Sequence, residues 1–284
     1  MPGSIYILLT AVLWSTAGIC VKLLPWSAFS IACSRGLLCG FLLLAIRLLH
    51  KPFKPVRFTR CNMLAGLCMF STSALYMLAI KLTTAANAIV LQYIAPILVL
   101  LYTMVIQRRR PEKIEIVLTF VVFTGCVLTF WDELNPGSIL GNLLALLSGI
   151  ALAAQIIVNR NEKTIQQDGL LIGCGLSFFV FLPFLLTDTQ LAFTPTTVAL
   201  GLFLGFIQYG AANLFFAKGI QRTDSLRASL LFTIEPILAP IWVYLFLNES
   251  PSFLAICGSV CVIAAVTIYN VYPLLSHKKS PATM

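Results

Sequence analysis

The chain has 284 residues, of which 59% are hydrophobic and 10% are charged, and its formal net charge at pH 7 is +9. Soluble domains usually carry about 25% charged residues. This composition therefore excludes a water-facing surface over most of the protein and indicates that lipid is its main solvent. The excess of bases does not indicate nucleic-acid binding, because the bases lie in loops between apolar stretches rather than on one polar face.

Ten apolar stretches follow one another along the chain, each close to the roughly 20 residues that cross a bilayer. Turn-forming residues separate them, as at Pro25, Pro111 and Pro195. We therefore predict an all-α integral membrane protein with ten transmembrane helices. The predicted spans are residues 4–24, 28–49, 60–81, 85–107, 112–131, 138–158, 169–187, 196–218, 225–247 and 252–275.

The basic residues alternate between the breaks and so predict an orientation. Lys and Arg are enriched in the short loops on the cytoplasmic side of a membrane. Only Lys22 and Lys81 lie in odd-numbered breaks, and Arg35 lies within the second span. We therefore expect both termini to be cytoplasmic, in a multi-pass protein of the plasma membrane. The other 16 of the 19 bases lie in even-numbered breaks or the C-terminal tail: Arg47, Lys51, Lys54, Arg57, Arg60, Arg108, Arg109, Arg110, Lys113, Arg160, Lys163, Lys218, Arg222, Arg227, Lys278 and Lys279.

The two halves of the chain resemble each other. Shifting the sequence by 140 residues lays 81–111 over 221–251 without a gap, and positions such as Thr83/Thr223 and Pro96/Pro236 match. Five spans per half is an odd number, so the second half must cross the membrane in the opposite sense. We therefore predict two inverted five-helix repeats, at residues 1–135 and 136–284, a common architecture of secondary transporters.

Several short motifs accompany this repeat. They are Ala11-Val12-Leu13-Trp14, Ser34-Arg35-Gly36, Tyr93-Ile94-Ala95-Pro96-Ile97, Ile234-Glu235-Pro236-Ile237 and Leu247-Asn248-Glu249. In order and spacing they resemble the EamA type of the drug/metabolite transporter superfamily over nearly the whole chain. One departure is that Arg108-Arg109-Arg110 replaces the family's usual acid after the fourth span.

The resemblance implies ten spans built as two five-span repeats, with both ends in the cytoplasm. It also implies secondary transport of metabolites such as amino acids, their derivatives or amine drugs, often outward. A small-molecule substrate and the bilayer are then the expected partners. We expect a monomer or homodimer that needs no cofactor or metal.

Two charged residues inside spans are candidates for binding a proton or a substrate charge. Glu235 lies near the middle of the ninth span, where an ionised, unpaired carboxylate is costly and usually faces a cavity or a partner. Pro236 follows it and frees a backbone carbonyl one turn earlier, near Phe232. Arg35 can pair with Glu235, bind a substrate carboxylate, or extend its head group outward. A protonated, structural Glu235 is the alternative.

Amide and aromatic side chains inside other spans should face the protein interior, because an amide is costly in hydrocarbon. Such groups combine the polar and aromatic linings typical of ligand pockets, although each could instead hydrogen-bond between helices. The candidate substrate-binding residues are Trp14, Tyr76, Gln92, Tyr93, Gln155, Gln208 and Asn213.

A solute carrier is favoured over other classes of membrane protein, including a purely structural scaffold, which would not explain Glu235 inside a span alongside inverted repeats. A lipid or lipid-linked-sugar flippase is not distinguished well from a solute carrier by sequence. An integral membrane enzyme is less favoured, because Glu112 and Glu115 are interpreted as solvated charges at a helix start and no catalytic acid pair occurs. Direct ATP use is disfavoured by the lack of a Walker A motif. The expectation is a transporter, not an enzyme.

Overall fold

The computed structural model describes residues 2–49, 55–134, 138–247 and 252–276. In this part of the chain all the regular structure is helical. The α-helices are α1 (Gly3–Ser15), α2 (Ala17–Leu23), α3 (Ala28–Leu49), α4 (Arg60–Leu82), α5 (Ala85–Gln92), α6 (Ala95–Val105), α7 (Lys113–Thr129), α8 (Ile139–Arg160), α9 (Gln166–Leu186), α10 (Pro195–Leu202), α11 (Ala212–Ile220), α12 (Ser225–Phe232), α13 (Ile234–Leu247) and α14 (Phe253–Ser276). A 3-10 turn, η1 (Trp131–Glu133), follows α7, and a π-helix, η2 (Phe203–Ala211), joins α10 to α11.

These elements form the ten predicted membrane helices. Nine segments of the described chain are long and apolar enough to span a bilayer. The fifth predicted span is α7, whose 17 residues lie at the lower end of the usual range of about 17–25. Large apolar side chains such as Leu49, Ile139 and Phe253 are about four-fifths exposed. In water such a surface would aggregate, so it is a lipid-facing surface.

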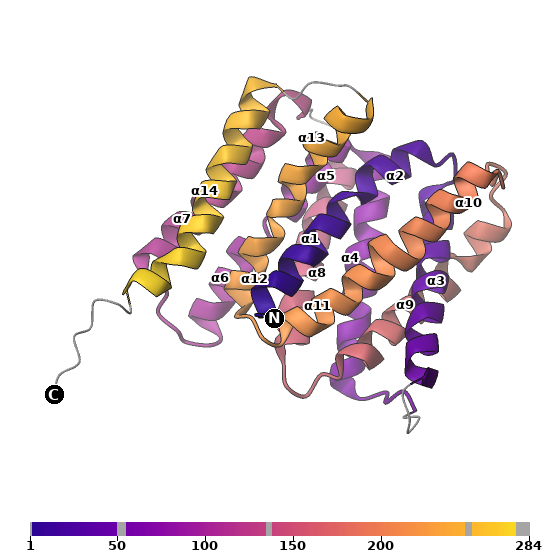
Figure 1. Cartoon of the computed structure of the whole chain (residues 1–284), viewed down its shortest axis with the longest axis horizontal. Coiled ribbons are helices and arrows are strands. Elements are labelled where there is room, and N and C mark those ends of the chain that lie inside the picture. Colours follow the sequence, from indigo (N-terminus) through magenta and orange to yellow (C-terminus); the bar gives the residue numbers. More distant parts are fainter. Residues whose placement is uncertain (1, 50–54, 135–137, 248–251, 277–284) are drawn as a thin grey trace.

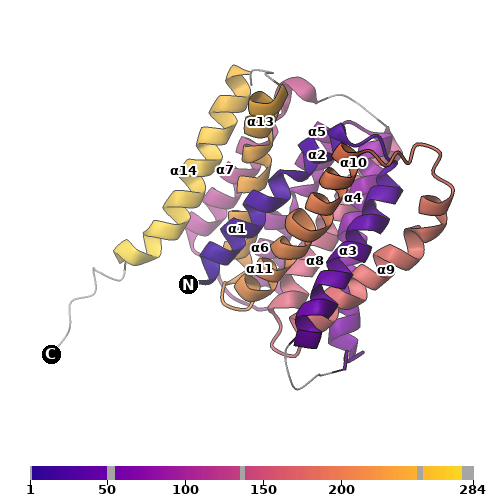
Figure 2. The ribbon, with the colours of Figure 1, turned by 45° about the vertical axis from the view of Figure 1, so that its right-hand side comes forward.

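The pairing of helices follows the inverted repeat. The fifth and tenth spans, α7 and α14, lie side by side at one edge of the bundle, and the second and seventh, α3 and α9, pack along each other (Figures 1 and 2). The third span packs along the sixth (α4 on α8), and its counterpart, the eighth, packs along the first (α11 on α1). Exchanging the two halves therefore reproduces the same set of contacts. The predicted repeat boundary, between residues 135 and 136, lies outside the described residues.

Within the described residues, four of the spans are not continuous α-helices. The first breaks at Thr16, the fourth at Tyr93 and Ile94, the ninth at Thr233, and the eighth contains the nine-residue π-helix η2. The breaks in the fourth and ninth spans occupy equivalent positions under the 140-residue shift, and each precedes a proline, Pro96 or Pro236. A proline cannot donate to the helical hydrogen-bond ladder, so both helices are weakened at the same depth.

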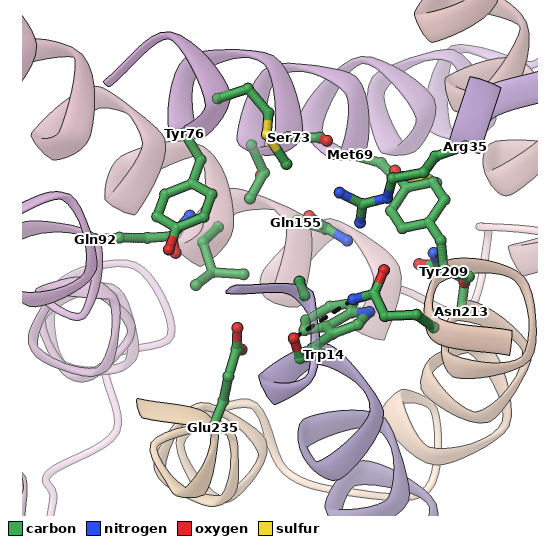
Figure 3. A pocket seen from close by; sticks show the side chains of 15 residues that line it. Trp14, Arg35, Met69, Ser73, Tyr76, Gln92, Gln155, Tyr209, Asn213 and Glu235 are labelled. Carbon is green, nitrogen blue, oxygen red and sulfur yellow. Dashed lines mark hydrogen bonds between the residues drawn. The ribbon is translucent and has the colours of Figure 1, made fainter. Parts of the chain in front are cut away.

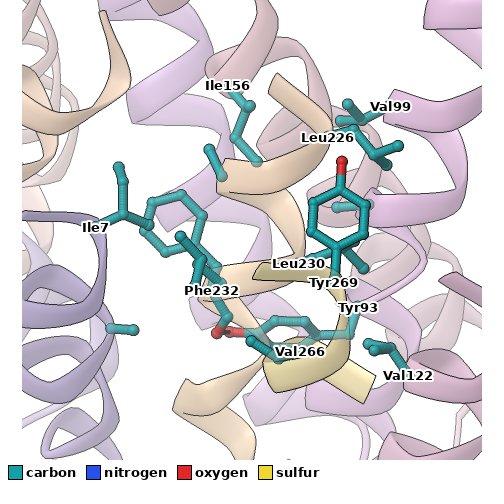
Figure 4. Packing of buried hydrophobic residues seen from close by; sticks show 14 of the residues in the cluster. Ile7, Tyr93, Val99, Val122, Ile156, Leu226, Leu230, Phe232, Val266 and Tyr269 are labelled. Atoms are coloured by element: carbon teal, nitrogen blue, oxygen red, sulfur yellow. Dashed lines mark hydrogen bonds between the residues drawn. The ribbon is translucent and has the colours of Figure 1, made fainter. Parts of the chain in front are cut away.

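A buried apolar cluster joins the two halves. It includes Ile7, Val99, Ile156, Phe232 and Val266 (Figure 4). These side chains come from α1 and α6 of the first half and from α8, α12 and α14 of the second, so the two halves share one core. Because lipid is as apolar as the cluster, close packing rather than exclusion of water holds it together.

One sequence interpretation is wrong at the start of α7. Glu115 was expected to be a solvated charge, but it is 6% exposed. Its carboxylate accepts hydrogen bonds from Arg109, at 2.7 Å, and from the Tyr269 hydroxyl, at 3.2 Å. The reason is tertiary: α14 packs along α7 and covers a helix start that sequence alone places in solvent.

Candidate functional site

A cavity of about 90 Å³ lies where the two halves meet. Such a volume holds several waters or a small solute, because one water needs about 10–15 Å³ measured in this way. Both repeats contribute to it, through the first, second, third and fourth spans and the sixth, eighth and ninth. Its lining residues are Trp14, Ala17, Arg35, Met69, Thr72, Ser73, Tyr76, Met77, Gln92, Leu152, Gln155, Gln208, Tyr209, Asn213 and Glu235 (Figure 3).

Glu235 enters this cavity from the break between α12 and α13. It is the second residue of α13 and lies near the middle of the span Ser225–Phe246. Its Oε2 accepts a hydrogen bond of 2.7 Å from the Tyr93 hydroxyl. Tyr93 lies at the break between α5 and α6, so the two weakened helices meet through this pair. The same hydroxyl lies 3.1 Å from the Phe232 carbonyl oxygen, the carbonyl that we expected Pro236 to free.

Arg35 enters the cavity from α3, on the side opposite Glu235 (Figure 3). Its guanidinium carbon lies 4.4 Å from the centre of the Tyr209 ring, a cation–π distance. The residue is 6% exposed, so its head group does not extend to the surface. Among the described residues it makes no ion pair with Glu235, and its Nε has no hydrogen-bond partner. The direct Arg35–Glu235 pair considered from the sequence is therefore not formed.

Several polar atoms in the cavity wall lack partners within the described part of the protein. Besides Arg35 Nε they are Trp14 Nε1, Gln208 Oε1 and Asn213 Oδ1. Buried polar atoms are nearly always hydrogen-bonded. These donors and acceptors line a space large enough for a guest, so the cavity is equipped to bind a polar solute or ordered water.

Local structure orients the amides. Gln208 lies in the π-helix η2, and its Nε2 donates to the Trp14 carbonyl at 3.4 Å (Figure 3). The Asn213 Nδ2 donates to the Tyr209 carbonyl at 2.8 Å. In both amides the side-chain nitrogen therefore donates to a backbone carbonyl, and among the described residues the side-chain oxygen has no partner. π-helical turns are frequently found at functional sites.

The structure brings eight of the nine residues singled out from the sequence to this cavity: Trp14, Arg35, Tyr76, Gln92, Gln155, Gln208, Asn213 and Glu235. Tyr93 is the ninth, and it lies behind Glu235 rather than in the wall. Their roles in binding stay predictions. Ser15 and Asn87, polar residues of the first and fourth spans, instead make contacts between helices, with Trp242 and Asn142 respectively.

One wall of the cavity was not predicted from the sequence. Met69, Thr72 and Met77 lie on α4, beside Ser73 and Tyr76. Positions 69, 73, 76 and 77 follow the spacing of three and four residues that marks one helix face. That period could have extended the prediction from Tyr76 to its neighbours. Ala17 and Leu152 carry no such signal, because small and apolar residues occur on every face of these helices.

Comparison with known proteins decides the family. The sequence matches the EamA-like transporter family over residues 1–131 and again over 139–271. The chain belongs to the EamA-like transporter family. The two matched segments correspond to the two repeats seen in the fold, and the protein is accordingly a multi-pass membrane transporter.

Two transporters of other organisms resemble the chain over almost its full length. YicL of Salmonella typhimurium, described as an uncharacterized inner membrane transporter, is 26% identical over 94% of this chain and 95% of its own. YwfM of Bacillus subtilis, an uncharacterized transporter, is 28% identical over 89% of this chain and 90% of its own. A solved crystal structure has a TM-score of 0.81 at 17% identity, covering 95% of this chain and 97% of the other, which shows a shared fold. The Asn248-Glu249 part of the family-like motif lies outside the described residues.

Proposed function

We propose that this protein is a secondary active transporter that exports a small organic metabolite, an amino acid or an amine, in exchange for protons. The observation that carries the proposal is the placement of Glu235 and Arg35 on opposite sides of one cavity between the repeats. Each side chain would recognise the opposite charge on a solute. A zwitterion such as an amino acid matches both, with its carboxylate at Arg35 and its ammonium at Glu235.

The surroundings of the two charges support this assignment. Arg35 retains unfilled donor capacity at its Nε, and its guanidinium lies over the ring of Tyr209. Charge-assisted hydrogen bonds from Arg to a carboxylate are among the strongest in proteins. Around Glu235 the wall is aromatic and amide, from Trp14, Tyr76 and Gln92. Such a wall accommodates an ammonium group without presenting a second cation.

Glu235 also supplies a physical basis for exchange. One carboxylate neutralises one positive charge, so a proton and a substrate ammonium group compete for it. Export of the amine-bearing solute would then alternate with inward movement of a proton. Alternation between the two sides follows from rocking of one inverted repeat against the other.

The test measures stabilisation of the purified protein by three matched sets of compounds. Each set contains an amino acid, the amine lacking its carboxylate and the acid lacking its amino group, built on the side chains of alanine, threonine and leucine. We expect at least one amino acid to raise the unfolding temperature more than its amine or acid. Arg35→Gln should remove the advantage over the amine, and Glu235→Gln the advantage over the acid.

Two results would contradict the proposal. Stabilisation by lipids alone would favour a flippase, and stabilisation by amino acids that is unchanged in both variants would remove these residues from the site. A compound that binds is then loaded into proteoliposomes with an imposed pH gradient. Exchange should depend on the gradient in the wild type and lose this dependence in Glu235→Gln.

A further inference from the structure

Tyr93 occupies an unusual position, because it joins the two helix breaks that the inverted repeat makes equivalent. It is the C-cap residue that directly follows α5, and its side chain reaches Phe232, the last residue of α12. It is 3% exposed, and Figure 4 shows its ring packed beside Phe232. Its hydroxyl has two acceptors within hydrogen-bonding distance, Glu235 Oε2 at 2.7 Å and the Phe232 carbonyl oxygen at 3.1 Å.

The Phe232 carbonyl needs an outside donor. In a continuous helix it would accept from the backbone N–H four residues later, but that residue is Pro236, which has no N–H. A buried carbonyl without a partner is costly. The Tyr93 hydroxyl is therefore the group that can tie the end of α12 to the fourth span.

One hydroxyl has one proton, so it cannot donate to both acceptors at once. An ionised Glu235 can only accept a hydrogen bond. It receives the one hydrogen bond that the Tyr93 hydroxyl can donate, so the Phe232 carbonyl is left unpaired. A protonated Glu235 is itself a donor. It can donate to the Tyr93 oxygen, and the Tyr93 proton can then turn to the Phe232 carbonyl, which satisfies all three groups in one chain.

We propose that Tyr93 is a positioning residue that transmits the protonation state of Glu235 to the break between α12 and α13. Protonation of Glu235 closes the hydrogen-bond chain and holds the break against the fourth span, whereas ionisation releases the break. The inference rests on the proposed function of Glu235 as the proton site and adds how its occupancy reaches the backbone.

Other titratable groups face this pair. Arg35 of α3 and Tyr76 of α4 lie across the cavity from Glu235, and Cys126 of α7 lies near Tyr93. Among the described residues, Tyr93 is the one side chain that hydrogen-bonds to Glu235. Arg35 and Tyr76 influence the charge on Glu235 through space. The hydrogen-bonding groups described at the break are those of Tyr93, Glu235 and Phe232.

The first measurement is the pH dependence of Glu235 labelling by dicyclohexylcarbodiimide, which reacts with protonated carboxyl groups in apolar surroundings. Peptide mass spectrometry quantifies the label on Glu235, and Glu235→Gln provides the blank. Because the Tyr93 hydroxyl is hydrogen-bonded to this carboxylate, Tyr93→Phe should move the labelling midpoint away from the wild-type value, by roughly one to two pH units.

The second measurement is hydrogen–deuterium exchange of peptides covering residues 226–240, corrected for the chemical exchange rate at each pH. Wild-type exchange should rise as the pH passes the labelling midpoint. Tyr93→Phe should exchange fast on both sides of it. Pro236→Ala restores an N–H for the Phe232 carbonyl while sparing the Tyr93–Glu235 bond, so it should lose the exchange step and retain nearly the wild-type midpoint.

Tyr269→Phe is the matched control, because Tyr269 is also a buried tyrosine whose hydroxyl donates to a carboxylate, that of Glu115, away from the cavity. It should keep both the midpoint and the exchange step. A wild-type midpoint and exchange step in Tyr93→Phe would overturn the inference. An exchange step that persists in Pro236→Ala would also overturn the inference. The Pro236→Ala variant therefore tests the inference even if Tyr93→Phe does not fold. Neither measurement uses a substrate, so a failed binding test of the proposed function remains a separate result.

Discussion

At the residue scale, two opposite charges are buried in one membrane protein without neutralising each other. Arg35 is held by the face of Tyr209, and Glu235 by the hydroxyl of Tyr93. Charged groups inside a membrane are costly and usually face a cavity or a partner. Here each has an aromatic partner and also faces the cavity, which leaves both charges able to meet a solute.

Arg35→Lys tests whether the stacked geometry matters beyond the charge. Lysine keeps a positive charge but has neither the planar fork that matches a carboxylate nor the same stacking on an aromatic ring. We expect the affinity for a carboxylate-bearing ligand to fall about tenfold or more, with a small change in unfolding temperature. Titration of the amino acid identified in the stabilisation screen measures it. Wild-type affinity in this variant would show that charge alone suffices.

Asp188 lies outside the spans, in the loop between α9 and α10, where its carboxylate accepts from the Ser27 backbone N–H at 3.0 Å and the Ser30 hydroxyl at 2.5 Å. Desolvation works against its ionisation but is outweighed by hydrogen bonds from Ser30 and Ser27, which lower the pKa of Asp188 to about 2. Its contribution to stability is therefore present above the unfolded-state pKa of about 3.9 and is lost as the pH falls toward 2.

Asp188→Asn should accordingly flatten the pH dependence of unfolding between about pH 4 and pH 2. The hydrogen bonds weakened by this substitution lie at the start of α3, where both donors are located. Unfolding temperatures of the two proteins over this range provide the measurement, and Asp132→Asn, a change in the exposed 3-10 turn after α7, is the control. Parallel pH profiles for Asp188→Asn and the wild type would contradict this role.

At the element scale, glycines set how closely the paired helices approach. Gly125 of α7 and Gly258 of α14 face each other, and a Cβ built on Gly258 would lie 2.5 Å from the Gly125 carbonyl oxygen and from the Thr129 nitrogen. These are backbone atoms, which cannot move aside without moving a helix. The fifth and tenth spans therefore pack at a distance that only glycine permits, in the manner of small-residue contacts in membranes.

Gly258→Ala should destabilise the protein by about 1–3 kcal/mol, because it overpacks a backbone contact. Gly175→Ala of α9 is the control, since nothing lies within 4 Å of a Cβ built there. The control should be neutral or slightly stabilising, because alanine favours helix more than glycine does. Unfolding in detergent compares the two, and equal effects would show that the α7–α14 contact is looser than described.

The sequence indicated much of this element structure, but not all of it. The spans could be predicted because the length and apolarity of a segment are properties of a continuous stretch of sequence. Pro236 likewise predicted that the Phe232 carbonyl needs a donor. The donor itself, Tyr93, is 139 residues away from Phe232 in the chain, and only the fold brings it there. The π-helix around Gln208 has no proline or other local mark, and the burial of Glu115 depends on α14 packing over α7.

At the scale of the whole molecule, the two repeats meet through equivalent contacts at opposite ends. Gly141 of α8 lies against the turn at Leu82 and Thr83, and Gly3 of α1 lies against the turn at Arg222 and Thr223. The turns are related by the 140-residue shift. The α4–α5 turn and the α11–α12 turn lie at opposite ends of the bundle (Figure 1), as an inverted repeat requires.

The inverted architecture was predictable because five spans per repeat is an odd number and because the bases alternate along the chain. The polar wall of the cavity was predictable because amides and charges inside spans must face inward. What could not be predicted was the arrangement within that wall, in which Arg35 lies across from Glu235 instead of pairing with it. Such geometry depends on how helices distant in sequence rotate and pack.

The shared cavity and the proposed exchange mechanism both require that the two repeats cross the membrane in opposite orientations. Leu82, the last residue of α4, and Arg222, in the turn between α11 and α12, are equivalent under the 140-residue shift and both are exposed. Each is therefore changed to cysteine in a protein whose native cysteines have been replaced. A membrane-impermeant maleimide is applied to intact cells and then to broken ones. We expect Leu82→Cys to react in intact cells and Arg222→Cys to react only after the membrane is broken. Reaction of both positions from the same side would contradict the opposite orientations of the two repeats.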